Sequence, residues 1–306
     1  MTNPRMFIEG QVFHVTRRTR EGRFLLRPSD YINHVMAYEL ARSVNKYGVE
    51  LSGVTVMSNH LHIQGVDRKA RRSDFMQRTN CSVSLRVRKT YGITGGIWED
   101  GSFTDVVIAD EQQELNTLLY VWLNPVKDGL VKKVRHWPGF QILPEHWGKE
   151  ITVKKPKAHY GRTGAEEVTF TPQPPAGLRD VPLKEAVALA NGMIIKAEKA
   201  HAKKRKKKKK GVLGVHKIRT VDPMAKPRKG LPSRGSLTRF SASTAEGERQ
   251  ARERYRIFLD RYQTQRQRWQ AGQKAVFPCG TVKLRRQAPI KCKDVPRDMP
   301  GLYREE

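Results

Sequence analysis

The feature that most constrains the fold is a very short link between two strand-like segments. Residues 49–57 (VELSGVTVM) and 60–66 (HLHIQGV) are rich in β-branched and apolar side chains, and only Ser58 and Asn59 separate them. Strands with so short a link pair as an antiparallel hairpin, because a parallel pair needs a crossover of about a dozen residues or more. The sequence therefore predicts a hairpin here, and with it an antiparallel sheet.

Strand and helix patterns alternate around this hairpin. Residues 11–18 alternate as a half-buried strand does, and residues 30–46 carry apolar side chains near helical spacing until Tyr47-Gly48 ends them. The elements that complete the series are a helix over 71–91, a strand over 103–109 and a helix from about 110 to 123, stopped by Asn124-Pro125. The first six elements are those of a ferredoxin-like split βαβ sheet with helices on one face, so the predicted fold class is α+β. The last helix is then expected to lie across or beside the sheet.

The charge of the chain is large and unevenly distributed. Its 306 residues carry 59 Lys and Arg against 30 Asp and Glu, a formal net charge of +29. Residues 1–150 hold 21 basic and 16 acidic side chains, a net of +5, whereas residues 151–306 hold 38 and 14, a net of +24. So basic a chain favours a polyanionic partner, because each phosphate contact releases condensed counterions. Nucleic acid is the expected partner, and a cationic tail that only keeps the protein soluble is the alternative.

Composition also disfavours several classes of protein. No apolar run approaches the roughly 20 residues that cross a membrane, and the first twenty residues lack the apolar stretch of a secretory signal. Cys81, Cys279 and Cys292 are too few and too scattered for a disulfide framework or a four-cysteine zinc site. We therefore expect a soluble, cytoplasmic protein with reduced thiols.

The second half of the chain differs from the first in composition. Residues 151–182 hold Lys154-Lys155-Pro156 and four further prolines, which is typical of a linker. Residues 183–306 are predicted to form a basic, partly disordered extension that binds nucleic acid. The patterns within it indicate a helix over 183–201, an extended, self-repelling run of cations at 203–210, a flexible segment over 211–245, a helix over 246–270 and a small strand within 277–286.

His60 and His62 stand two residues apart on a predicted strand. Side chains at i and i+2 point to the same face of a strand, so both imidazoles face one side while Leu61 and Ile63 point into the core. Two neutral imidazoles on one face can bind a divalent metal ion. Taken alone, the triplet is also compatible with a histidine pair that binds no metal.

A second pair of polar side chains ends the last predicted helix. Tyr120 and Asn124 are four residues apart, so they share a helix face. A neutral phenol is a poor nucleophile, but a metal that withdraws charge from a phosphate makes its attack feasible, and the Asn124 amide offers an oxygen as a third ligand. The alternative is that Tyr120 packs on the sheet and Asn124 only ends the helix before Pro125.

Four motifs occur together in the first 150 residues. They are FHVTRRT at 13–19, VMSNHLHIQG at 56–65, GGIWEDGSF at 95–103 and YVWLNPVKDGLV at 120–131. In this order they resemble the REP-associated tyrosine transposases, relatives of the IS two-hundred/six-hundred-five single-strand transposases in the His-hydrophobe-His (HUH) endonuclease superfamily. The second and fourth motifs are the specific ones, because each joins reactive residues to a fixed flanking context.

The resemblance implies a bacterial, nucleoid-associated enzyme whose catalytic domain lies in residues 1–150. Tyr120 would attack a phosphodiester of single-stranded or hairpin DNA, leaving a 5′-phosphotyrosine link and a free 3′-hydroxyl. His60 and His62 would bind Mg²⁺ or Mn²⁺, with Asn124 as the third ligand. The free 3′-hydroxyl would later attack the link and rejoin the strands without a nucleotide cofactor. Neither a small-molecule substrate nor a membrane is an expected partner.

A single-stranded substrate usually calls for a cationic groove and for aromatic side chains on which bases stack. Candidates for the groove are Arg17, Arg18, Arg86, Arg88, Lys89 and Lys127, with solvated surface cations as the alternative. Trp98 and Trp122 are candidates for stacking, with core packing as the alternative.

The chain also departs from the family pattern at two places. Family members carry Tyr-His-Val where this chain has Phe13-His14-Val15, and Arg-Phe-Lys-Ser where it has Ser102-Phe103-Thr104-Asp105. The second departure places an acidic side chain near the expected phosphate path. Neither touches the expected catalytic residues. Two other functions stay open: a domesticated protein that holds hairpin DNA or RNA without cutting it, and a relaxase-type nickase. The sequence also leaves open whether the protein is a monomer or a homodimer.

Overall fold

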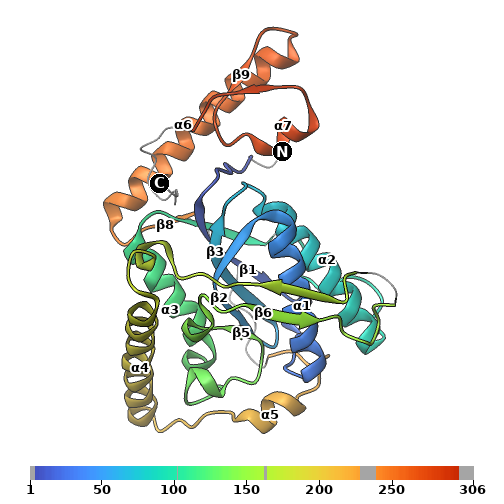
Figure 1. Cartoon of the computed structure of the whole chain (residues 1–306), viewed down its shortest axis with the longest axis vertical. Coiled ribbons are helices and arrows are strands. Elements are labelled where there is room, and N and C mark those ends of the chain that lie inside the picture. Colours follow the sequence, from blue (N-terminus) through green and yellow to red (C-terminus); the bar gives the residue numbers. More distant parts are fainter. Residues whose placement is uncertain (1–3, 102, 162–163, 228–238, 296–306) are drawn as a thin grey trace.

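The computed structural model describes residues 4–101, 103–161, 164–227 and 239–295, and its centre is a six-stranded sheet (Figure 1). The strand order is β5-β2-β3-β1-β4-β8, in which β8 is Phe240–Ser241. The elements of the first half are β1 (Gln11–Arg18), α1 (Asp30–Tyr47), β2 (Val49–Val56), β3 (His60–Asp67), α2 (Arg72–Tyr91), β4 (Thr104–Ile108), α3 (Glu111–Lys127) and β5 (Gln141–Ile142).

The four central strands have the order of a split βαβ sheet. β2 and β3 pair antiparallel with Val56 opposite Leu61, which confirms the predicted hairpin. β1 lies between β3 and β4 and is antiparallel to both, with Thr16 opposite His62. The α+β class and the ferredoxin-like arrangement are therefore confirmed.

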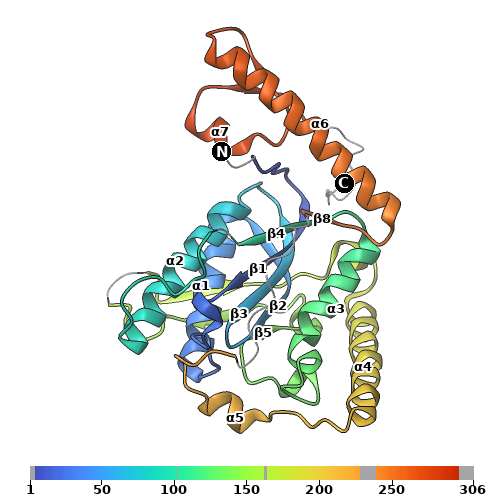
Figure 2. The ribbon, with the colours of Figure 1, turned by 180° about the vertical axis from the view of Figure 1, so that it is seen from behind.

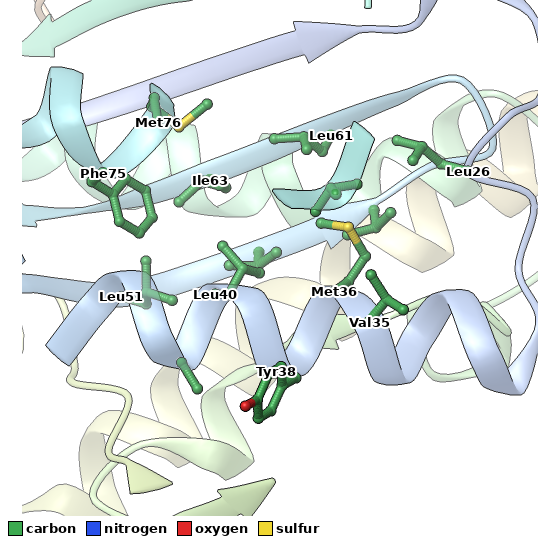
Figure 3. Close-up of a cluster of buried hydrophobic side chains, with 14 of the residues drawn as sticks. Leu26, Val35, Met36, Tyr38, Leu40, Leu51, Leu61, Ile63, Phe75 and Met76 are labelled. Carbon is green, nitrogen blue, oxygen red and sulfur yellow. The ribbon is translucent and has the colours of Figure 1, made fainter. Parts of the chain in front are cut away.

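The two faces of the sheet are covered by different helices. α1 and α2 cover one face, where side chains such as Met36, Leu40, Ile63 and Phe75 form the main core (Figure 3). α3 covers the opposite face so closely that a Cβ at Gly53 would lie 2.6 Å from Leu118 Cδ2. The last helix of the series thus lies across the sheet, on the face to which the even-numbered residues of β3 point.

α3 does not end where the sequence predicted. It continues through Asn124-Pro125 to Lys127, so the predicted stop at residue 123 is wrong. Pro125 removes one helical hydrogen bond, but buried side chains on this turn, including Val126, hold the backbone in place. The continuation matters because it keeps the end of the YVWLNPVK motif on one rigid helix.

Residues 151–182 are more ordered than a linker. β6 (Ile151–Lys154) and β7 (Glu167–Phe170) pair as an antiparallel hairpin, and both contact α1. Val153, Tyr160 and Phe170 from this segment are buried in the main core. The prediction of a plain linker here is wrong, because the prolines flank the strands and leave their ladder intact. The division of the chain at residues 150 and 182 stays a prediction.

The basic run also behaves differently from the prediction. α4 (Leu183–Lys207) packs along α3 through Ala186, Ala190 and Ile194, and the helix includes the first five residues of 203–210 (Figure 1). The run was expected to be extended, but the Arg205 guanidinium donates to the Val126 carbonyl at 3.2 Å and fixes the end of α4 on α3.

The chain after α4 returns to the base of the sheet through α5 (Val215–Thr220), which Figure 2 shows below α3 and α1. The Leu213 amide donates to the Gly129 carbonyl, and the Arg27 guanidinium donates to the Val221 carbonyl. The predicted flexible segment 211–245 therefore contains a helix, and its residues 228–238 lie outside the described residues.

The last described residues form a small unit at the other end of the sheet. It comprises β8 (Phe240–Ser241), α6 (Ala245–Gln270), β9 (Val276–Phe277), α7 (Val282–Gln287) and β10 (Lys291–Cys292). α6 confirms the helix predicted over 246–270, whereas most of 277–286 is a turn and a helix instead of a strand. Phe258, Tyr262 and Phe277 form its core, and the Phe7 amide bonds to the Gly280 carbonyl. None of the helices described is both long and apolar enough to span a membrane.

Candidate active site

Four aromatic rings from β1, β3 and α3 meet on the face of the sheet that α3 covers. The His62 ring lies 4.9 Å from that of His60, 5.3 Å from that of His14 and 5.4 Å from that of Tyr120, measured between centroids. The structure therefore brings the predicted histidine pair and the predicted tyrosine into one cluster.

The local folding rules explain this meeting. The alternation of β3 points His60 and His62 to the same face, and the register of β1 sets Thr16 directly opposite His62. His14 lies on the same face of β1, two residues away. α3 crosses this face and presents Tyr120 to the rings. The site thus depends on the antiparallel pairing of β1 with β3.

His62 is the most enclosed member of the cluster. Its side chain is 3% exposed, and its Nδ1 lies 3.1 Å from both Thr16 Oγ1 and His14 Nε2. Its Nε2 is buried and has no hydrogen-bond partner. If Nδ1 carries the proton and donates it to Thr16 or His14, Nε2 keeps a lone pair, which is the tautomer a metal ligand requires.

The electrostatic surroundings keep the imidazoles neutral. Burial lowers the pKa of His14 and that of His60 to about 4, with nearby Arg18 adding to the effect at His60. Burial, followed by the charges of neighbouring groups such as His60, also holds the pKa of His62 well below its usual value. Neutral imidazoles are the form that binds a cation, so at neutral pH these side chains need no deprotonation first.

Tyr120 and Asn124 occupy different environments on α3. The Tyr120 side chain is 40% exposed, and the Lys127 ammonium lies 4.7 Å from the centre of its ring. Asn124 is buried, and its amide nitrogen donates to the Tyr120 backbone carbonyl at 2.8 Å. The amide is therefore oriented by its own helix, which leaves its side-chain oxygen as the atom available to a ligand.

The donor set fits a hard divalent ion in part. Two neutral imidazoles, one with an unpartnered buried nitrogen, and one amide oxygen are groups that Mg²⁺ or Mn²⁺ accepts alongside substrate oxygens and water. In the described part of the chain, no three histidine, cysteine, aspartate or glutamate side chains are arranged to hold a metal ion.

The predicted DNA-contacting cations are not gathered in one place. Arg17 and Arg86 are buried and donate to the backbone carbonyls of Gly101 and His159. Arg88 and Lys89 are exposed in the last turn of α2. Of the six predicted cations, Arg18 and Lys127 are the two that lie beside the ring cluster, where both influence the His62 imidazole.

The two tryptophans also differ. Trp122 is buried, and its indole nitrogen donates to the Ile142 carbonyl at 2.9 Å, so core packing is its role. Trp98 is half-buried, with its indole nitrogen bonded to the Asn80 carbonyl. Asp105, the unusual acidic residue, is nearly buried and forms an ion pair with Arg72 at 2.9 Å, so it faces the interior rather than a phosphate path.

His14 and Thr16 are the site residues that the sequence prediction missed. The period-two pattern of residues 11–18 did place them on one face, but the pairing register that sets them beside His62 cannot be read from one strand. The histidine inside the FHVTRRT motif was the available signal.

Comparisons with known proteins show which family the chain resembles. No protein-family model matches the chain. A curated protein of Haemophilus influenzae, provisionally named a REP-associated tyrosine transposase, is 28% identical over 147 residues, covering 41% of this chain and 81% of the relative. The resemblance to the REP-associated tyrosine transposases is thereby confirmed.

Two solved structures are similar at lower levels. One is a REP-associated tyrosine transposase bound to a REP hairpin, with 19% identity, a TM-score of 0.40, and coverage of 48% of this chain and 84% of that chain. The other is a transposase-like protein of Deinococcus radiodurans R1, with 16% identity, a TM-score of 0.28, and coverage of 38% and 93%. Both TM-scores are low, so the family resemblance rests on sequence.

Proposed function

We propose that this chain, a relative of the REP-associated tyrosine transposases, cleaves and rejoins single-stranded or hairpin DNA with Tyr120 as its nucleophile. The observation that carries the proposal is the contact between the Tyr120 ring and the neutral, buried His62 imidazole, 5.4 Å apart. A half-exposed phenol beside an unpartnered histidine nitrogen gives one group that can reach a substrate and one that can bind a cation. DNA is the proposed partner, at the nucleoid of a bacterial cytoplasm.

His60, His62 and Asn124 are the residues proposed to hold Mg²⁺ or Mn²⁺. When bound there, the ion would withdraw negative charge from the scissile phosphate and so ease nucleophilic attack. Thr16 and His14 keep the His62 ring in a fixed orientation, as partners of ligand histidines commonly do.

The proposed reaction conserves the phosphodiester bond energy. The Tyr120 oxygen forms a bond to phosphorus and releases its proton to solvent, which its 40% exposure permits. The bond from phosphorus to the 3′ oxygen breaks, and that oxygen takes up a proton to become a 3′-hydroxyl. The reverse attack by a 3′-hydroxyl rejoins the strand and frees Tyr120.

The position of Tyr120 favours accessible phosphates. Lys127 lies over its ring and supplies a positive charge next to the reacting group. A phosphate that approaches the exposed edge of α3 would meet this ammonium first. Single strands and hairpin loops present phosphates in more orientations than a regular duplex does, so they suit a site of this kind.

The test uses one hairpin oligonucleotide labelled either at its 5′ end or at its 3′ end. With Mn²⁺ present, the 3′ label is expected to migrate covalently with the protein, whereas the 5′ label is released on a fragment with a 3′-hydroxyl. Tyr120→Phe is expected to abolish the adduct while DNA binding persists, and a chelator is expected to abolish it in the wild type.

Tyr31→Phe is the matched control, since Tyr31 is a partly exposed tyrosine on α1, at the other face of the sheet, and should form the adduct normally. If the wild type forms no adduct on any of several hairpins, or if Tyr120→Phe still forms it, the proposed function is wrong. The first of these results would favour a protein that binds hairpins without cutting them.

A further inference from the structure

A second feature of the molecule is a groove between α4 and the segment that follows α3. It is lined on one side by Lys132, Lys133 and Val134, and on the other by residues of α4 from Asn191 to Lys206. Its volume is about 1020 Å³. Figure 2 shows α4 beside α3, and the segment that follows α3 supplies the other lining residues of the groove.

The rim of the groove is strongly basic. Seven lining side chains are Lys or Arg, and two, Glu145 and Glu198, are acidic. The Glu198 carboxylate accepts a hydrogen bond from the Val134 amide at 2.6 Å, so part of its charge is already used within the wall. Lys132, Lys133 and Lys199 are exposed. The groove therefore has an excess of positive charge that faces solvent.

The apolar side chains that line the groove, which we call its floor, have the opposite character. Ile194 is buried in the core between α3 and α4, and next to it Ile195 is 51% exposed. Val134 and Leu143 also line the floor and belong to the core between α3 and α4. A lining of both apolar and basic side chains suits a ligand that has apolar surfaces as well as negative charge.

The groove is connected to the Tyr120 site through the end of α3. Arg205, on the groove wall, donates to the Val126 carbonyl. The next residue is Lys127, whose ammonium lies over the Tyr120 ring. The end of α3 thus contacts both a groove residue and the proposed nucleophile.

We propose that this groove binds a single-stranded segment of nucleic acid, with its bases on the apolar floor and its phosphates on the basic walls. Nucleic acid is the expected ligand because of the proposed function, on which this inference rests. A single strand is the expected form because its exposed bases can contact the apolar floor. A duplex hides its bases and offers only phosphates, so it gains nothing from Ile195. The groove makes α4 an element that guides the strand leading to or from Tyr120.

The test compares two triple variants that lose the same charge. Lys132→Gln, Lys133→Gln and Lys199→Gln neutralise the groove, while Lys149→Gln, Lys157→Gln and Lys184→Gln neutralise exposed lysines that do not line it. The probe is an oligothymidylate of about 20 nucleotides, which forms no hairpin, and its binding is measured by fluorescence anisotropy over a range of salt.

The groove variant is expected to lose about tenfold or more in affinity. The slope of log affinity against log salt should become shallower by about 2, because fewer phosphates are neutralised. The control variant should change much less. An equal loss in both variants would mean that only the overall field attracts DNA, which would overturn the proposal. An equal loss of single-strand and duplex affinity in the groove variant would also overturn it.

Ile195→Gln tests the floor without a change of charge. Because Ile195 is half-exposed, the variant should fold normally, and circular dichroism with a melting curve checks this. We expect about a fivefold loss of oligothymidylate affinity with an unchanged salt slope and unchanged duplex binding. Unchanged single-strand affinity in a folded variant would contradict the role of the floor.

Failure of the groove and failure of the proposed reaction give different results. If the groove variant loses oligothymidylate binding but no covalent adduct ever forms with the wild type, the proposed groove is supported and the proposed reaction is wrong. If the adduct forms on saturating hairpin DNA while the groove variant binds oligothymidylate normally, the proposed reaction is supported and the proposed groove is wrong.

Discussion

His62 is the side chain whose surroundings restrict its chemistry most. Burial keeps it neutral, and two groups on β1 lie 3.1 Å from its Nδ1. The nitrogen that remains, Nε2, has no partner among the described residues. A buried polar atom without a partner is costly, and a metal ion at the proposed site would supply the partner that this nitrogen lacks.

Thr16→Val tests the orientation of this ring. The substitution keeps the side-chain shape and removes Oγ1 as a partner of His62, so we expect about a tenfold loss of Mn²⁺ affinity by calorimetry. Thr55→Val is the control, because Thr55 lies opposite His62 on β2 and its hydroxyl bonds to Gln141 instead. Equal Mn²⁺ affinity in wild type and Thr16→Val would show that Thr16 does not hold the ligand.

At this scale the sequence predicted local geometry. The i, i+2 and i, i+4 spacings predicted that His60 and His62 share one face and that Tyr120 and Asn124 share another, since these periodicities are local, whereas their proposed roles came from the family resemblance. His14 and Thr16 were not singled out, because strand register is set by the packing of the whole sheet. Arg17 and Arg86 could not be recognised as buried, since their carbonyl partners are distant in sequence.

Among the elements, α2 is anchored to the sheet by a buried ion pair. Arg72, in the first turn of α2, lies 2.9 Å from an oxygen of Asp105 on β4 and 3.8 Å from one of Asp67 on β3. The 2.9 Å contact lacks hydrogen-bond geometry, so it is mainly electrostatic. This pairing explains why β4 carries an acidic residue where the family pattern has a neutral one.

Asp105→Ala should therefore be strongly destabilising. It leaves the Arg72 charge buried with weaker compensation, and breaking such a pair costs about 3–5 kcal/mol. Urea unfolding of the variant measures this cost, with Asp180→Ala, at an exposed aspartate, as the control. A loss of stability no larger than that of the control would mean that Asp67 alone neutralises Arg72.

Glu114 makes the packing of α3 sensitive to pH. Burial raises the pKa of its carboxyl to about 7, although the Ala176 amide donates to it at 2.9 Å. A raised carboxyl pKa stabilises the folded protein at pH values below the unfolded pKa of 4.5, and this contribution is lost as the pH rises through about 7. The shift corresponds to about 3 kcal/mol.

Glu114→Gln should remove this pH dependence. Between about pH 5 and pH 8 the free energy of unfolding of the wild type should fall relative to that of the variant by about 3 kcal/mol. Glu185→Gln, at an exposed position on α4, should follow the wild type. Parallel curves for wild type and Glu114→Gln would show that Glu114 keeps an ordinary pKa.

Across the whole molecule, the proposed active-site residues and most of the charge lie in different halves of the chain, but the two halves are packed together. The chain after α4 bonds to Gly129 and to Arg27, and the last unit bonds to Phe7. The sequence predicted the charge asymmetry correctly, because composition records it directly. It could not predict that the basic run continues a helix, since the contact of Arg205 with α3 depends on tertiary packing.

The end of the basic run should bind nucleic acid without discrimination. Lys207, Lys208 and Lys209 are exposed and lie outside the groove lining. Replacing all three with Gln should make the slope of log affinity against log salt shallower by about 2, for single strands and duplexes alike. Adduct formation at saturating DNA should be unchanged. Anisotropy titrations measure the slopes, and an unaltered slope would show that these lysines remain solvated.

The most direct test of the central claim locates the covalent bond. The adduct formed on a hairpin oligonucleotide is digested with nuclease and trypsin, and the peptide spanning 90–127 is fragmented in a mass spectrometer. This peptide contains two tyrosines, Tyr91 and Tyr120, so the fragment ions must distinguish them. The account predicts the nucleotide mass on Tyr120. A nucleotide on Tyr91 or on any other residue would contradict it.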